Sequence, residues 1–163
     1  MYEAIRRPTQ PKRSRTLTLP LLLCGIILGA GVLLCVWAGH YQMQFRSFIQ
    51  ELGEVTMEAR QKGSYSVRVE GEAVDFDDEE LSRLFYRLSQ AGSGRPGDAP
   101  GSEPEVVVDY GGGVTLEIWI VPLVNPGNEW TEGPFFRYTG REGQIYCYDT
   151  DQLRPDSFLR LFS

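Results

Sequence analysis

The chain has 163 residues, 42% of them hydrophobic, and a formal net charge of −6 at pH 7. That length allows one small domain beside a membrane span. Five of the 16 basic residues but only one of the 22 acidic residues precede position 19, so the rest of the chain holds 11 basic and 21 acidic residues, a net charge of −10. Because nucleic acid is itself a polyanion, we expect no nucleic-acid partner.

The cysteine and histidine counts exclude several classes of site. Cys24 and Cys35 fall within an apolar stretch, so Cys147 has no partner in its own compartment if the domain is exported, and a disulfide-stapled fold is excluded. His40 is the only histidine in the sequence, which removes Ser-His-Asp and Cys-His triads and histidine-based zinc sites. We therefore predict no catalytic residue, no metal site and no cofactor.

Residues 1–18 are predicted to form a basic, disordered cytoplasmic tail, because they mix Lys and Arg with Pro, Ser and Thr and show no apolar period. Basic residues that flank a span stay on the cytoplasmic side. Five precede the apolar stretch, whereas Arg46 and Arg60 follow it. The expected orientation at the cell membrane is single-pass, with the amino terminus cytoplasmic and the carboxyl-terminal domain extracytoplasmic.

Residues 19–39 are predicted to be a transmembrane helix. The twenty residues of LPLLLCGIILGAGVLLCVWA carry no charge, and at roughly 1.5 Å per residue they span the roughly 30 Å hydrocarbon core of a bilayer. Signal peptides that are cleaved have shorter apolar cores, of roughly 7 to 15 residues. The lipid bilayer is therefore the first predicted partner.

Gly25 and Gly29 form a GxxxG pattern within this span. Such a pattern lets two helix backbones approach closely. Two interpretations stay open: the span pairs with a second copy or with another helix through this face, or it stays alone in lipid, where glycine is common in any case.

Residues 40–62 are predicted to form an amphipathic, membrane-proximal helix. Apolar side chains recur near the i, i+3, i+4, i+7 positions of one face. This stripe packs either against the sheet of the same chain or into a short parallel coiled coil. It consists of Phe45, Phe48, Ile49, Leu52, Val55 and Ala59.

From Ser64 the apolar period changes to two, which predicts a hairpin that turns at Glu70-Gly71. Asp77 then resembles an N-cap, and Glu80 completes a capping box three residues later. The apolar positions that follow predict a helix to about residue 91, which Gly92 ends.

Residues 92–104 contain four Gly and three Pro, so we predict a flexible loop. The stretch EVVVDYGGGVTLEIWIV predicts two strands joined by the glycines 111–113. Two further strands follow in FFRYTGREGQIYCYD, whose inward side chains are predicted to be Phe136, Tyr138, Ile145 and Cys147. A short helical turn after Pro155 is expected to pack back on the sheet.

The loop PLVNPGNEWTEGP supplies the candidate partner-binding residues of the domain: Leu123, Val124 and Trp130. Apolar and aromatic side chains on long loops are often contact residues. A tryptophan that folds back over a small core is an equally frequent arrangement. Both interpretations stay open.

In sum, the order of elements predicts an α+β fold: residues 63–163 form an extracytoplasmic domain with one antiparallel sheet of about six strands (β-β-α-β-β-β-β-α) packed against helices. Because no catalytic set is visible, we expect a membrane-anchored binding or regulatory module for a protein or a cell-envelope component. One alternative is a small hydrolase that cleaves envelope glycans with carboxylates alone. The other is an accessory subunit of a membrane complex that acts through its span.

Overall fold

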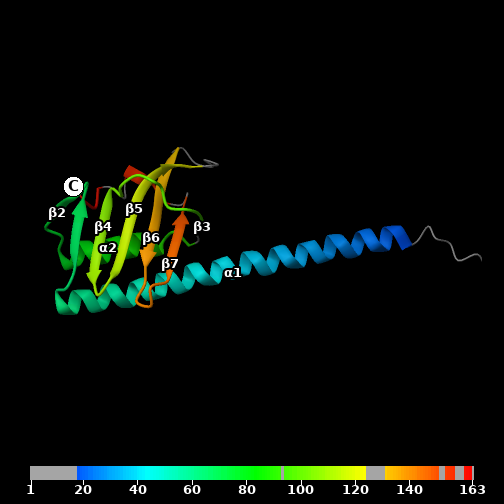
Figure 1. Ribbon diagram of the computed structural model, residues 1–163, viewed down its shortest axis with the longest axis horizontal. Coiled ribbons are helices and arrows are strands. Elements are labelled where there is room, and N and C mark those ends of the chain that lie inside the picture. Colours follow the sequence, from blue (N-terminus) through cyan, green and yellow to red (C-terminus); the bar gives the residue numbers. More distant parts are fainter. Residues whose placement is uncertain (1–17, 93, 124–130, 151–152, 157–159, 163) are drawn as a thin grey trace, which may run out of the picture. The chain divides into compact units, whose positions relative to one another are not determined.

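The structure is a computed structural model that describes residues 18–92, 94–123, 131–150, 153–156 and 160–162. Within these ranges it has an α+β architecture with two helices and one antiparallel sheet of seven strands (Figure 1). The chain divides into two compact units, Met1–Ala38 and Gly39–Ser163. The predicted fold class, α+β with one antiparallel sheet, is confirmed, and the sheet has seven strands where about six were predicted.

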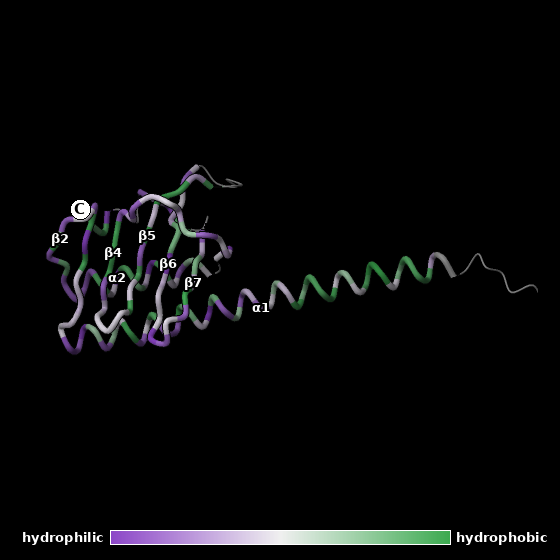
Figure 2. The backbone as a smooth tube through the Cα atoms, viewed as in Figure 1, coloured by the Kyte–Doolittle hydropathy of each residue, from purple (hydrophilic) through white to green (hydrophobic). Residues whose placement is uncertain are grey.

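The first unit contains the beginning of helix α1, which runs from Thr18 to Lys62. Every residue from Pro20 to Ala38 is exposed, and Figure 2 shows this part of the helix as predominantly hydrophobic. Among the described residues, α1 is the one helix long and apolar enough to cross a membrane.

The rest of α1 belongs to the second unit, where one of its faces is buried. The side chains of Phe48 and Leu52 are fully inaccessible to solvent, and those of Phe45, Val55 and Ala59 are at most 5% exposed. All five pack in the core of their own domain. Of the two interpretations of the apolar stripe, packing against the sheet is therefore the one that the structure confirms.

Helix α1 ends where glycine takes a left-handed conformation. Gly63 has φ +58°, and its amide donates to the carbonyl of Arg60 at 3.4 Å while the Ser64 amide donates to that of Ala59 at 3.1 Å. These two bonds form a Schellman motif, which satisfies the last helical carbonyls. The position of this cap fixes where the chain leaves α1 to begin the sheet.

The strands lie in the order β2-β1-β4-β5-β6-β7-β3, and every neighbouring pair is antiparallel. The predicted turns are confirmed: Glu70 and Gly71 have positive φ, as do all three glycines 111–113. The strand bounds are β1 Ser66–Val69, β2 Glu72–Val74, β3 Arg95–Pro96, β4 Val106–Gly111, β5 Val114–Pro122, β6 Glu132–Thr139 and β7 Ile145–Asp149.

Helix α2 runs from Asp78 to Ser89 and begins with the predicted capping box. The Asp77 carboxylate accepts from the amides of Glu79 and Glu80 at 2.8 Å each, and the Glu80 carboxylate accepts from the Asp77 amide at 2.9 Å. Where α2 meets α1, a Cβ on Gly53 would lie 2.8 Å from Cζ of Phe85. Glycine at position 53 therefore allows the two helices to come into close contact. Helix α2 also contributes three buried side chains to the core: Leu81, Leu84 and Leu88.

The predicted orientation of β7 is wrong. Tyr138 pairs with Tyr146 directly across the strands, so both tyrosines point to the helix side of the sheet. The ring of Phe48 lies 6.0 Å from that of Tyr146, whereas Ile145 is 63% exposed and Cys147 points to the opposite face with it. Both faces of β7 are apolar enough to be buried, so alternation does not decide the orientation, and the register with β6 does.

The seventh strand, β3, lies in the segment 92–104 that we predicted as a loop. Arg95 pairs with Asp149 at the edge of the sheet. A two-residue strand that contains a proline leaves no periodic signal in the sequence. The segment then crosses the sheet face opposite the helices, where the Ser102 carbonyl accepts from Nε1 of Trp119 at 2.9 Å. Trp119 is 2% exposed as a result.

The segment after β7 is described only in part. The Arg160 amide donates to the carbonyl of Asp156 at 3.3 Å, which is the spacing of one helical turn. Phe162 stacks on Phe76 with ring centroids 5.4 Å apart. The described part of the predicted terminal turn therefore packs on the domain core.

Candidate binding cavity beside the end of α1

Of the residues that the sequence singled out, the structure describes Leu123, Gly25 and Gly29. Leu123 is half-buried and its amide donates to the carbonyl of Thr131 at 2.8 Å, while Val124 and Trp130 lie outside the described residues. Gly25 and Gly29 belong to the first unit, and a Cβ added to either would meet no atom within 4 Å. The partner-binding role of these five residues stays a prediction.

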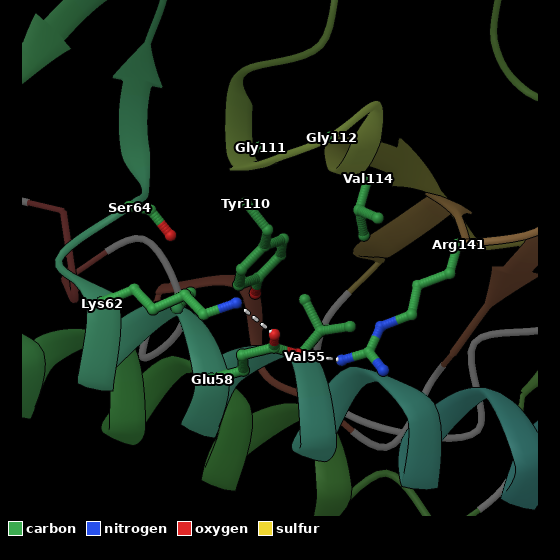
Figure 3. Close-up of a pocket in the computed structure, with 10 residues that line it drawn as sticks. Val55, Glu58, Lys62, Ser64, Tyr110, Gly111, Gly112, Val114 and Arg141 are labelled. Atoms are coloured by element: carbon green, nitrogen blue, oxygen red, sulfur yellow. Dashed lines mark hydrogen bonds and ion pairs between the residues drawn. The ribbon is translucent and has the colours of Figure 1, made fainter.

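A cavity of about 370 Å³ opens beside the last turns of α1 in the second unit (Figure 3). One wall is α1 itself, a second is the glycine turn between β4 and β5, and the third is the turn between β6 and β7. Sequence analysis did not predict this cavity, because its walls are distant in the chain. The lining residues are Val55, Glu58, Ala59, Lys62, Ser64, Tyr110, Gly111, Gly112, Val114 and Arg141.

Three of the lining residues are charged. Nζ of Lys62 lies 2.5 Å from one carboxylate oxygen of Glu58, and Nη2 of Arg141 lies 2.5 Å from the other. The hydrogen bond and the charge of Lys62, followed by the charge of Arg141, lower the pKa of the Glu58 carboxyl below its usual value of 4.5. Glu58 is therefore ionised at neutral pH, and the lining carries two positive charges against one negative charge.

The turn that carries Arg141 is fixed to α1 by a second carboxylate, Glu51. Its Oε1 accepts from the Arg141 backbone amide at 3.0 Å and from the Tyr138 hydroxyl at 3.3 Å, and its Oε2 accepts from the Gln144 side chain at 2.6 Å. A Cβ on Gly140 would lie 2.6 Å from the same Oε1. These contacts place the Arg141 guanidinium over the cavity.

The inner wall of the cavity is apolar. Val55, Ala59 and Val114 are at most 6% exposed. Tyr110 is also buried, and its hydroxyl oxygen accepts from the Thr56 hydroxyl at 3.5 Å. Burial raises the pKa of Tyr110 to about 12, so its phenol stays neutral at physiological pH and adds no charge to the site.

The cavity wall thus offers two cations, a carboxylate with a lowered pKa and an apolar patch. Among the described residues, no group of three or more His, Cys, Asp or Glu side chains is placed to hold a metal ion.

No family model matches the sequence, and neither a curated protein nor a solved structure was found to be similar to it. The class of protein is therefore given by the structure itself. The chain is an α+β protein with one antiparallel sheet and an N-terminal helix that is long and apolar enough to span a membrane.

Proposed function

We propose that the chain is a single-pass membrane protein whose extracytoplasmic domain is a non-enzymatic binding or regulatory module for a protein or a cell-envelope component. The observation that carries the proposal is the exposure of the N-terminal half of α1. Eleven large apolar side chains between Leu21 and Trp37 are each at least 53% exposed. Burying them in lipid is worth roughly 16 to 33 kcal/mol, at roughly 1.5 to 3 kcal/mol each.

The proposed orientation rests on charge. Five basic residues precede the span, which favours a cytoplasmic amino terminus. The domain that follows has a net charge of −10 and begins within a few residues of the span, since Phe45 is already buried in the domain core. The tail and the domain thus lie on opposite sides of the bilayer in this proposal.

The binding role is supported by the cavity beside the end of α1. Glu58 is the one carboxylate in its described lining, whereas glycoside hydrolysis by carboxylates requires a pair on either side of the scissile bond. This favours a binding module over the hydrolase alternative.

The topology is tested by labelling intact cells with a membrane-impermeant maleimide. Two single-cysteine variants, Thr9→Cys and Gln90→Cys, are made in a background in which the three native cysteines are alanine. Gln90 is exposed in the domain. We expect label on Gln90→Cys in intact cells, and on Thr9→Cys only after permeabilisation. Label on Thr9→Cys in intact cells would overturn the proposed orientation.

The binding role is tested by crosslinking in native membranes. If the domain recruits the partner, replacing residues 19–38 with polyleucine leaves the crosslinked partner unchanged, whereas loss of the partner would favour the accessory-subunit alternative. Deleting residues 123–131 and substituting Trp130→Ala then tests the predicted contact loop. An unchanged partner in both of these variants would show that this loop is not the contact.

A further inference from the structure

We propose that the cavity beside the end of α1 binds a small monocarboxylate, with the ligand carboxylate between Lys62 and Arg141 and a short aliphatic group against Val55 and Val114. The inference deepens the proposed function and rests on it, since it assigns a ligand class to the binding module. The cavity volume of about 370 Å³ lies at the lower end of the range for small-molecule sites, roughly 300 to 1,000 Å³.

The charge of the lining selects the ligand. Lys62 and Arg141 share Glu58, the one carboxylate in the described lining, so the lining itself carries one excess positive charge. The neighbouring Glu51 carboxylate is bonded to the Arg141 backbone amide rather than to its guanidinium. A carboxylate supplied by a ligand makes the lining neutral. A phosphate, with roughly −1.5 to −2 charges at pH 7, would overcompensate the cluster and repel Glu58.

Both cations keep donors for a ligand. An Arg guanidinium has about five N–H donors and a Lys ammonium about three, and among the described residues each cation makes one side-chain bond, to Glu58. The Arg141 and Lys62 side chains are 45% and 63% exposed. Figure 3 shows them converging on Glu58 from two different elements, α1 and the turn after β6.

The geometry of the site does not depend on Glu58 alone. Glu51 holds the backbone of Arg141 at 3.0 Å, and Lys62 belongs to the last turn of α1. When Glu58 loses its charge, we expect both cations to stay at the cavity, where no lining carboxylate then competes with a ligand for their side chains. The direction in which Glu58→Gln changes the affinity for the ligand therefore distinguishes a binding site from a purely structural ion-pair cluster.

The test uses the isotopically labelled full chain in zwitterionic detergent micelles and follows the backbone amides of Gly111 and Gly112 by NMR during titration with butyrate. Butyramide and inorganic phosphate are the comparison probes. We expect saturable shifts with butyrate, and binding of butyramide weaker by about tenfold or more, since a hydrogen bond to a charged group discriminates by that factor.

The variants sharpen the test. Arg141→Gln is expected to weaken butyrate binding about tenfold and Lys62→Gln about threefold or more, whereas Glu58→Gln is expected to tighten it. The matched control is Arg83→Gln on α2, which removes an exposed i,i+4 pair with Glu79 outside the cavity and should leave binding unchanged. An undisturbed spectrum of the core amides shows that each variant is folded.

Three results would overturn the ligand class: no saturable shift with butyrate, equal binding of butyrate and butyramide, or weaker binding in Glu58→Gln. Stronger binding of phosphate than of butyrate would assign the site to phosphate instead. If the cell-labelling pattern and the crosslinked partner persist in spite of such a result, the membrane-anchored module stands and only its ligand is reassigned.

Discussion

The two halves of α1 have similar backbone structure but opposite surroundings. Residues 20–38 are exposed on every side of the helix, although nearly all of them are apolar. In residues 45–59 the apolar side chains lie on one buried face, except for Met57, which is 62% exposed, and the opposite face is otherwise mainly polar. A helix that is apolar all round suits lipid, and one with an apolar stripe suits the surface of a globular core. The first half is thus apolar enough to cross a membrane, whereas the second half packs on a domain core.

Glycine illustrates the same contrast. Open space surrounds Gly25 and Gly29, where an added Cβ would meet nothing within 4 Å. At Gly53 the same atom would lie 2.8 Å from Cζ of Phe85. The glycines of the first half leave a smooth surface for lipid or another helix, whereas Gly53 is required by contact within the domain.

The largest expected difference between the halves comes from truncating a core side chain. Phe48→Ala removes a fully buried ring that contacts Tyr138 and Tyr148, and we expect it to lower the free energy of unfolding by about 3 to 5 kcal/mol. Leu33→Ala is the matched change in the first half, where the side chain is 72% exposed. Leu33→Ala should leave the denaturant midpoint of the domain unchanged. An equal loss of unfolding free energy in both variants would show that the two halves of α1 do not differ in their contribution to the domain core.

A charge placed in the first half of α1 should impair membrane insertion, whereas a charge placed in the second half should not. Leu28→Arg is expected to disfavour membrane insertion by about 2.5 to 3.5 kcal/mol, the cost of an arginine at the centre of a span. Gln50→Arg, on the exposed face of the second half, should not change insertion. A glycosylation-site assay of the inserted fraction measures both, and undiminished insertion of Leu28→Arg would argue that residues 20–38 do not span the bilayer.

The contact between the second half and the sheet can be weakened at a polar position. Glu51→Ala leaves the Tyr138 hydroxyl and the Arg141 amide without their acceptor, and we expect a loss of about 1 to 3 kcal/mol. Glu54→Ala is the control, because Glu54 is exposed and accepts one bond, from Gln50 at 3.3 Å. Urea denaturation measures the free energy of unfolding of both variants. An equal decrease in the two would show that Glu51 has no special role in holding the sheet to α1.

The smallest expected effect is a pH dependence. Because the pKa of Glu58 is lowered in the folded state, its ion pairs contribute stability above its usual pKa of 4.5, and this contribution is lost as the pH falls through the lower folded value. Carboxyl ¹³C NMR should give a titration midpoint below 4.5, and Lys62→Gln should move it upward. An unshifted midpoint in the original chain would show that the pairs with Lys62 and Arg141 do not form in solution.

Local signals in the sequence predict much of the fold. Asp77 and Glu80 mark the start of α2, and the glycines at 71 and 111–113 mark two turns, because caps and positive φ depend on residues close in the chain. The burial of the α1 stripe follows from its period. These features were predicted because each is decided within a few residues.

Features set by distant contacts were missed. The orientation of β7 depends on its register with β6, and β3 exists because β7 offers it an edge. The cavity joins Glu58 to Arg141, which is 83 positions away. In the sequence, Glu51 and Glu58 are indistinguishable from the other acids on the polar side of an amphipathic helix.

The most direct test is a nitroxide scan along α1 in bilayers, with accessibility measured to oxygen and to a water-soluble nickel chelate. From residue 22 to 36 we expect high oxygen and low nickel accessibility at every position. From residue 45 to 59 we expect both to fall every three to four positions, at the buried stripe. A helical period of protection within residues 22–36, or free access of nickel there, would contradict the assignment of this half of α1 to the membrane.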